Sequence, residues 1–207
     1  MKKLLVVFLL ISCALFAQEK TETFVIARTA IGNNAYNLVE VFQGRGRWIF
    51  PDVGYIDFND ANKYREIFIG GGGILYKSKN AILIHEVYLD QATGPLAASA
   101  LYFQPWTLFS FQISEKVSWE TVYFPYFPLN KAGRVQHVLE RSKVERDFKH
   151  WKLGLGYSGY QFAYNDWDHK PFFTTTLKTR AGEFEFWFQR VPNNHGQLQM
   201  RYAKTFR

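Results

Sequence analysis

The chain has 207 residues, of which 18% are aromatic and 21% charged, and its formal net charge is +7. Cys13 is the only cysteine, which excludes an internal disulfide and a cysteine-based zinc site. The lysines and arginines are dispersed among aromatic residues rather than gathered in a stripe, which argues against binding to nucleic acid. No segment has the composition of a linker, so one domain is expected.

The N-terminus has the pattern of a secretion signal, assigned to residues 1–17. Lys2 and Lys3 precede the short apolar run 4–11, and cleavage is expected after Ala17. Residues 10–13 alternatively resemble a bacterial lipobox, which would leave the chain anchored to lipid through Cys13. Either interpretation predicts export from the cytoplasm.

Residues 18–44 are the least regular part of the chain. Short strands are possible at 23–27 and 37–42. The segment is therefore interpreted as a periplasmic extension or as an extra pair of strands, ahead of a β-barrel domain at 45–207.

From residue 45 onward the sequence predicts about ten long strands, and most reach the 9–11 residues that a tilted strand needs to cross a membrane. Their expected ranges are 46–58, 64–76, 80–90, 97–113, 116–128, 134–146, 150–164, 171–180, 182–191 and 196–206.

The connections between these strands alternate in length. Tight turns are expected at 77–79, 114–115, 147–149 and 181–182, and longer connections at 59–63, 90–96, 130–133, 165–170 and 192–195. Short turns at one end and longer loops at the other are typical of membrane barrels, whose short turns face the periplasm. The alternation favours an even number of strands: ten, or twelve if 18–44 contributes two.

Several strands have one apolar and one polar face. In 97–113, Leu101, Phe103 and Phe111 share a face opposite Tyr102 and Gln104. A second group of aromatic residues, assigned to the interfacial girdle of the barrel, comprises Trp106, Trp119, Trp151 and Trp167.

Two stretches do not fit simple alternation. The four glycines 70–73 lie inside an expected strand and predict a bend or a close approach of backbones, with no following helix or lysine to form a phosphate loop. Residues 134–148 carry charges on both faces, with Arg141 and Lys143 on one and Glu140 on the other. The charged half is expected near a rim, or against a partner.

The C-terminal hairpin at 182–206 carries the family resemblance. Phe184, Phe186 and Phe188 alternate with polar residues, and the last strand ends in Phe206, one residue before the C-terminal Arg207. A final alternating strand that ends in Phe resembles the C-terminal strand of bacterial outer-membrane β-barrels. The resemblance implies an all-β, antiparallel, up-and-down transmembrane barrel in the outer membrane. A soluble lipocalin-like barrel is the alternative fold.

The resemblance further implies a structural or porin-like role, with a small molecule or surface ligand and outer-membrane lipid as expected partners. Polar side chains of the last three strands are expected to fill a narrow lumen: Lys178, Arg180, Glu183, Glu185, Gln197, Gln199 and Arg201. No cofactor or metal is expected, and oligomeric state is not predicted. A soluble periplasmic barrel or lipoprotein that binds an apolar ligand is one alternative.

The other alternative is an outer-membrane hydrolase. No known catalytic motif is present, and the chain is expected not to be an enzyme. The weak catalytic candidates are Asp166, Asp168, His169 and His195, in two expected extracellular loops. Carboxylates beside an imidazole can activate water, although these residue types also populate loops for turn formation alone.

Overall fold

The computed structural model describes residues 20–32, 35–59, 64–94, 99–191 and 195–206. The expected signal at 1–17, the lipobox cysteine Cys13, Arg207 and most of the turn at 192–195 lie outside these residues. In the described part of the chain, no helix has the length and apolar character needed to span a bilayer.

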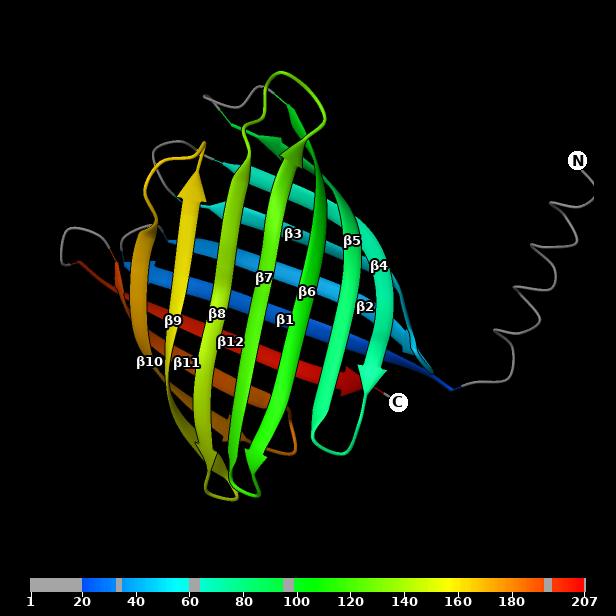
Figure 1. The fold of residues 1–207 in the computed structure, drawn as a ribbon, viewed down its shortest axis with the longest axis vertical. Helices are drawn as coiled ribbons and strands as arrows, with labels where there is room; N and C mark the ends of the chain where they lie inside the picture. Colours follow the sequence, from blue (N-terminus) through cyan, green and yellow to red (C-terminus); the bar gives the residue numbers. More distant parts are fainter. Residues whose placement is uncertain (1–19, 33–34, 60–63, 95–98, 192–194, 207) are drawn as a thin grey trace, which may run out of the picture.

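Twelve antiparallel strands form one closed barrel (Figure 1). They are β1 (Thr21–Gly32), β2 (Tyr36–Arg45), β3 (Trp48–Phe58), β4 (Arg65–Lys77), β5 (Ala81–Thr93), β6 (Ala100–Ser114), β7 (Val117–Pro128), β8 (Gln136–Asp147), β9 (Trp151–Phe162), β10 (Asp168–Lys178), β11 (Glu183–Val191) and β12 (His195–Phe206). Each strand pairs with its neighbours in sequence, and β1 pairs with β12 to close the ring.

The expectation of ten strands is corrected to twelve, the number kept as its alternative. The two additional strands are β1 and β2, which pair in register from Thr21 opposite Arg45 to Ala30 opposite Tyr36. β1 also pairs with β12 from Thr23 opposite Phe206 to Gly32 opposite Gln197. Both edges of β1 are thus hydrogen-bonded, which leaves no open edge in the sheet.

The alternation of connection lengths is confirmed between β3 and β10, where the connections 59–64, 94–99, 129–135 and 163–167 are longer than the turns that separate them. The expected longer connection at 192–195 is corrected, because it has three residues between its strands and is shorter than the turn at 179–182. The turns at 46–47, 78–80, 115–116, 148–150 and 179–182 lie at the end of the barrel where β1 begins and β12 ends. The other connections lie at the opposite end. We call these the turn end and the loop end; in outer-membrane barrels the turn end faces the periplasm.

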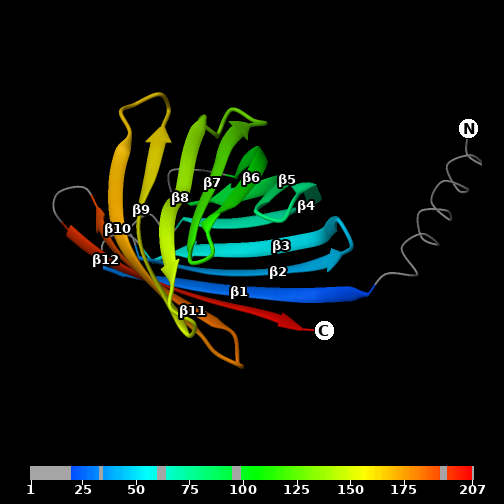
Figure 2. The ribbon, with the colours of Figure 1, turned by 60° about the horizontal axis from the view of Figure 1, so that its bottom comes forward.

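The strands are strongly tilted, so those of one wall cross those of the other in projection, as Figures 1 and 2 show. Alternation places large apolar side chains on the outside, where Leu89 is 58% exposed, Leu155 69% and Phe188 53%. The polar faces point inward, and Gln104 and Gln197 are buried. An apolar exterior around a polar interior is the arrangement of a barrel surrounded by lipid.

The glycine run 70–73 lies inside β4, where the barrel backbones approach closely. A Cβ on Gly72 would lie 2.0 Å from the carbonyl oxygen of His85, and one on Gly71 2.5 Å from that of Ile49. The register between β3 and β4 shifts beside this run, between Ile49 and Asp52. The expected close approach of backbones is therefore confirmed.

Candidate functional site: the barrel lumen

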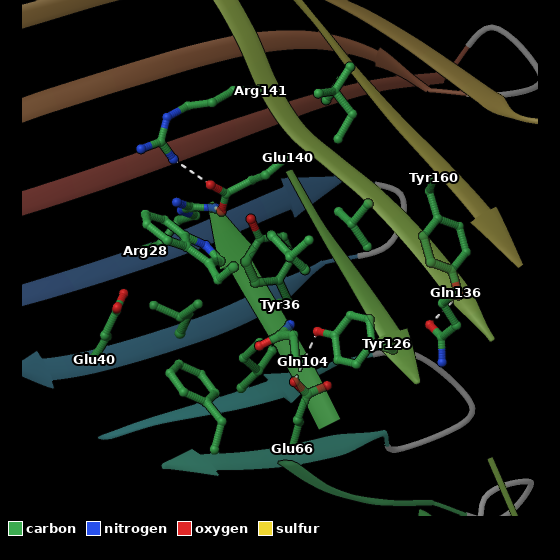
Figure 3. A pocket seen from close by; sticks show the side chains of 18 of the residues that line it. Arg28, Tyr36, Glu40, Glu66, Gln104, Tyr126, Gln136, Glu140, Arg141 and Tyr160 are labelled. Carbon is green, nitrogen blue, oxygen red and sulfur yellow. Dashed lines mark hydrogen bonds and ion pairs between the residues drawn. The ribbon is translucent and has the colours of Figure 1, made fainter. Parts of the chain in front are cut away.

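The lumen contains a cavity of about 860 Å³, lined by side chains from all twelve strands. Along β3 the lining extends from Ile49, the second residue of the strand, to Phe58, its last. Figure 3 shows the charged, amide and phenolic side chains that point into it. The cavity therefore extends along this wall from the turn end to the loop end.

β8 contributes an unusual set of charges because it contains a β-bulge. Val122 of β7 pairs with Arg141 while the next residue, Tyr123, pairs with Leu139, so Glu140 has no partner on β7. The pairing with β9 shifts at the same place, between Leu139 and Ser142. An extra residue of this kind turns two successive side chains to one face. Glu140 and Arg141 both line the lumen as a result.

The placement of the charged segment 134–148 at a rim or against a partner is therefore wrong. Arg141, Lys143 and Glu145 are each only 5% exposed and lie inside the barrel, where opposite charges compensate them. The outward positions of the strand carry residues such as Val144, which is 45% exposed. The inward positions of β8 keep these three charges away from lipid, whereas Arg146 is exposed on the outward face, next to the last residue of the strand at the turn end.

Ion pairs join β8 to three other strands across the interior. Arg28 of β1 pairs with Glu140, and Arg141 pairs with both Glu140 and Glu120 of β7. Lys143 pairs with Glu185 of β11 and, at 3.0 Å, with Glu145.

The last member of the network is Arg201 of β12, whose guanidinium lies 3.6 Å from the second carboxylate oxygen of Glu185. Glu120, Lys143, Glu145 and Glu185 do not line the cavity, so this part of the network fills the turn-end half of its wall. Buried charges of this kind are tolerated because they are paired and hydrogen-bonded.

Trp187 of β11 lies beside this network and lines the cavity. It is 2% exposed and stacks on Phe172, with ring centroids 5.1 Å apart and planes 12° apart. The guanidinium carbons of Arg28 and Arg141 lie 5.1 and 6.0 Å from its ring centre. Two cations thus contact one indole, as in cation–π interactions.

Amide side chains form a separate network among β9, β11 and β12. The Gln199 amide donates to Gln189 at 2.8 Å and to Gln197 at 2.9 Å, and Gln189 donates to Ser158 at 2.7 Å. Tyr36 of β2 donates to Gln199 at 3.0 Å. This neutral polar surface faces the cavity.

The wall built by β2–β5 is acidic. Its inward side chains include Glu40 of β2, Asp52 of β3, Glu66 of β4, and Glu86 and Asp90 of β5. Two phenols donate to Glu66, Tyr64 at 2.8 Å and Tyr126 at 3.0 Å. No lysine or arginine from these four strands lines the cavity in the described part of the chain.

Tyr64 precedes β4, at the loop end of this wall. Burial, together with the adjacent carboxylate of Glu66, raises the pKa of the Tyr64 phenol. The phenol therefore stays protonated and remains a hydrogen-bond donor to Glu66.

Four of the seven residues predicted to fill the lumen come together inside it. Glu185, Gln197 and Gln199 are buried, and Arg201 lines the cavity beside them. Lys178 instead pairs with Asp147 at the turn end, and Arg180 and Glu183 are exposed there. The role of the set in binding a ligand stays a prediction.

Sequence reasoning missed Arg28, the acidic wall and the inward position of Trp106. Trp106 lines the cavity instead of belonging to the interfacial girdle, because it follows the alternation of Tyr102 and Gln104. That alternation was visible in the sequence. The position of Arg28 depended on assigning 21–32 to a strand.

The four rim candidates for catalysis are not assembled. Asp168 lines the cavity, whereas His169 follows it in β10 and accordingly points outward, with Nδ1 2.6 Å from the hydroxyl of Tyr157. Asp166 and His195 are exposed. No hydrogen bond or ion pair joins any two of the four, and no metal-binding group of His, Cys, Asp and Glu occurs among the described residues.

A closed antiparallel barrel with an apolar exterior and a charged lumen has the fold of the porin-like β-barrels of bacterial outer membranes. No protein-family model matches the sequence. No curated protein matches it either.

Solved structures with the same fold are outer-membrane porins and channels. The NanC porin aligns with a TM-score of 0.61 at 10% identity, over 89% of this chain and 99% of that one. The KdgM porin aligns with a TM-score of 0.59 at 10% identity, over 89% and 98%. The COG4313 outer membrane channel from Pseudomonas putida F1 gives 0.57 at 13% identity, over 90% and 95%. At these identities the likeness shows the fold.

Proposed function

We propose that the barrel is a passive channel for small hydrophilic solutes and has no catalytic role. The observation that carries the proposal is the cavity of about 860 Å³, whose lining follows β3 from Ile49 to Phe58. A structural barrel without transport would need no cavity that reaches both ends of a strand.

The two walls of the cavity differ, and the difference supports passage of solutes along the wall formed by β2–β6. The ion pairs of β1, β7, β8, β11 and β12 fill the turn-end half of one wall, so the open path lies against β2–β6. The ion-paired charges are fixed by geometry, and they set the width of the path. The path is narrow because side chains fill much of the interior of a small barrel.

The acidic side chains that line the cavity restrict which solutes the proposed channel accepts. The KdgM porin has a solved complex with oligogalacturonate, a polyanion. In the present lumen such a chain would lie against the carboxylates of β2–β5, and like charges disfavour that arrangement. We therefore do not extend that ligand to this protein.

The test is single-channel recording. Refolded protein is first checked for a heat-dependent shift in gel mobility, which reports a closed barrel, and is then added to a planar bilayer in potassium chloride. Discrete, ohmic conductance steps are expected. A folded, inserted barrel that gives neither steps nor swelling of liposomes in small sugars would overturn the proposal.

A further inference from the structure

We infer that the acidic wall of β2–β5 binds the positively charged group of an organic cation, and that the channel thereby prefers cationic solutes. The inference rests on the proposed channel function and names its solute class. It follows from three observations: carboxylates without countercharge, fixed cations that are paired elsewhere, and aromatic side chains beside the carboxylates.

The first observation is the state of the carboxylates. Glu86 lines the cavity, is 4% exposed, and its Oε1 has no hydrogen-bond partner in the described part of the chain. Oδ1 of Asp52, which is 1% exposed, and both carboxylate oxygens of Asp90, which is 2% exposed, also have no hydrogen-bond partner there, although these two side chains lie behind the cavity lining. Buried acceptors without a partner are costly, and a cation in the cavity beside Glu86 would satisfy its Oε1.

These carboxylates also interact with each other. Asp52 interacts electrostatically with Glu40 and Glu86, and its Oδ2 accepts a hydrogen bond from Tyr88 at 2.9 Å. Carboxylates that repel each other in this way need either a shared proton or a positively charged partner. No group of three or more His, Cys, Asp and Glu side chains that could hold a metal ion occurs among the described residues.

The second observation is that the cations of the lumen are paired on the opposite wall. Arg28, Arg141 and Lys143 form ion pairs with Glu120, Glu140, Glu145 and Glu185, and Arg201 shares Glu185. Glu40 is the acid of β2–β5 that interacts electrostatically with Arg28 and Arg201.

The other two cavity-lining cations are Arg134 and Lys170, which belong to other strands or connections. Arg134 donates to the carbonyls of Lys131 and Gly133, and Lys170 lies near Asp168 and over the ring of Tyr160. Neither is ion-paired to the acids of β2–β5, so Asp52, Glu86 and Asp90 have no lysine or arginine as an ion-pair partner in the described part of the chain.

The third observation is the surface around Glu86. Its cross-strand neighbour on β6 is Trp106, and both line the cavity. Phe68 and Tyr88 meet edge to face beside them, with ring centroids 5.4 Å apart. Ile84 and Leu108 continue the lining toward the turn end. A cationic head bound at Glu86 would therefore place an apolar or aromatic body against aromatic faces, which also attract cations.

The first experiment measures the sign of the selectivity. Reversal potentials across a potassium chloride gradient are expected to show preference for potassium over chloride. The current is then titrated with phenethylammonium and with phenylpropionate, which carry the same body and opposite charges. Block by the cation and not by the anion is the expected result.

The second experiment uses the same two probes on the folded barrel in detergent. Trp106 and Trp187 line the cavity, so binding is followed by tryptophan fluorescence and needs no conduction. A saturable change of tryptophan fluorescence with phenethylammonium, and none with phenylpropionate, supports the inference. Equal response to both probes, or to the anion alone, overturns it.

The variant Glu40→Gln/Glu86→Gln removes two inward charges while keeping side-chain size. It is expected to weaken phenethylammonium binding about tenfold, equal to about 1.4 kcal/mol. The matched control is Asp57→Asn on β3, because Asp57 pairs with Arg65 at the loop end and does not line the cavity. The control is expected to bind like the unchanged protein; equal weakening in both variants counts against the acidic wall.

The outcomes separate the two proposals. A channel that conducts but prefers chloride, or is blocked by the anion, leaves the channel function standing and overturns the cation site. A folded barrel without current but with cation-specific fluorescence change retains the site and overturns the channel function.

Discussion

Arg28 and Glu140 form an ion pair inside the barrel although 112 residues separate them in the chain. Arg28 comes from β1, a strand that closes the ring, and Glu140 is the extra residue of the bulge in β8. Their contact therefore depends on two features of the tertiary structure at once: twelve-strand closure and a local change of register.

Replacing Glu140 with Gln should destabilise the barrel by about 3–5 kcal/mol, because it removes the carboxylate shared by Arg28 and Arg141 and leaves buried positive charge uncompensated. The measurement is the denaturant midpoint of the barrel in lipid vesicles. Glu115→Gln, in the exposed turn between β6 and β7, is the control and should change the midpoint little. An unchanged midpoint for Glu140→Gln would show that the pair contributes nothing.

Replacing Trp187 with Ala should increase single-channel conductance, because the indole lines the cavity beside Arg28. Trp187→Phe, which keeps a ring to stack on Phe172, should stay nearer to the unchanged protein. Trp151→Ala is the matched control, since Trp151 is 40% exposed and stacks on Phe148 at the turn end. Equal conductance in all of these proteins would show that Trp187 does not lie at the narrowest point of the conducting path.

Replacing Gly72 with Ala should reduce the yield of folded barrel. The new Cβ would lie 2.0 Å from the carbonyl oxygen of His85 and 2.6 Å from the Cα of Glu86, and backbone atoms cannot move aside as a side chain does. Overpacking of this kind costs about 1–3 kcal/mol or more. Gly196→Ala is the control, because no atom lies within 4 Å of its added Cβ. The measurement is the fraction of protein whose gel mobility changes on heating, which reports the yield of folded barrel.

Cysteines at Val25 and Lys204 should form a disulfide, because these residues are direct partners between β1 and β12. The bond would join the two ends of the barrel chain, and the heated, unreduced protein should migrate differently until it is reduced. The mismatched pair Val25→Cys with Met200→Cys is the control, since Met200 pairs with Thr29. Cross-linking of the mismatched pair alone would contradict twelve-strand closure.

The period of two in the sequence was sufficient to predict most of the strands and their faces. Leu101 and Phe103 are exposed and Tyr102 and Gln104 buried, as alternation requires. The order of short and long connections predicted that the chain enters and leaves the barrel at the turn end, because each hairpin reverses the direction of the chain. The buried positions of Glu185, Gln197 and Gln199 followed from the same rule.

What alternation alone could not determine was closure and register. The segment 21–45 mixes small, polar and apolar residues, and its strands are stabilised by pairing with β12 and β3. Strict alternation also puts Glu140 and Arg141 on opposite faces, whereas the bulge puts both in the lumen.

Local patterning was therefore enough to predict a long-stranded antiparallel barrel with an apolar outside, because side-chain direction along a strand is a local property. Which charges meet inside depends on the closed ring. Arg28 pairs with β8 while Glu86 and Asp52 face the lumen without a fixed cation, because the ring brings together strands that are distant in the chain. The sign of each wall, and with it the proposed solute, depends on that arrangement.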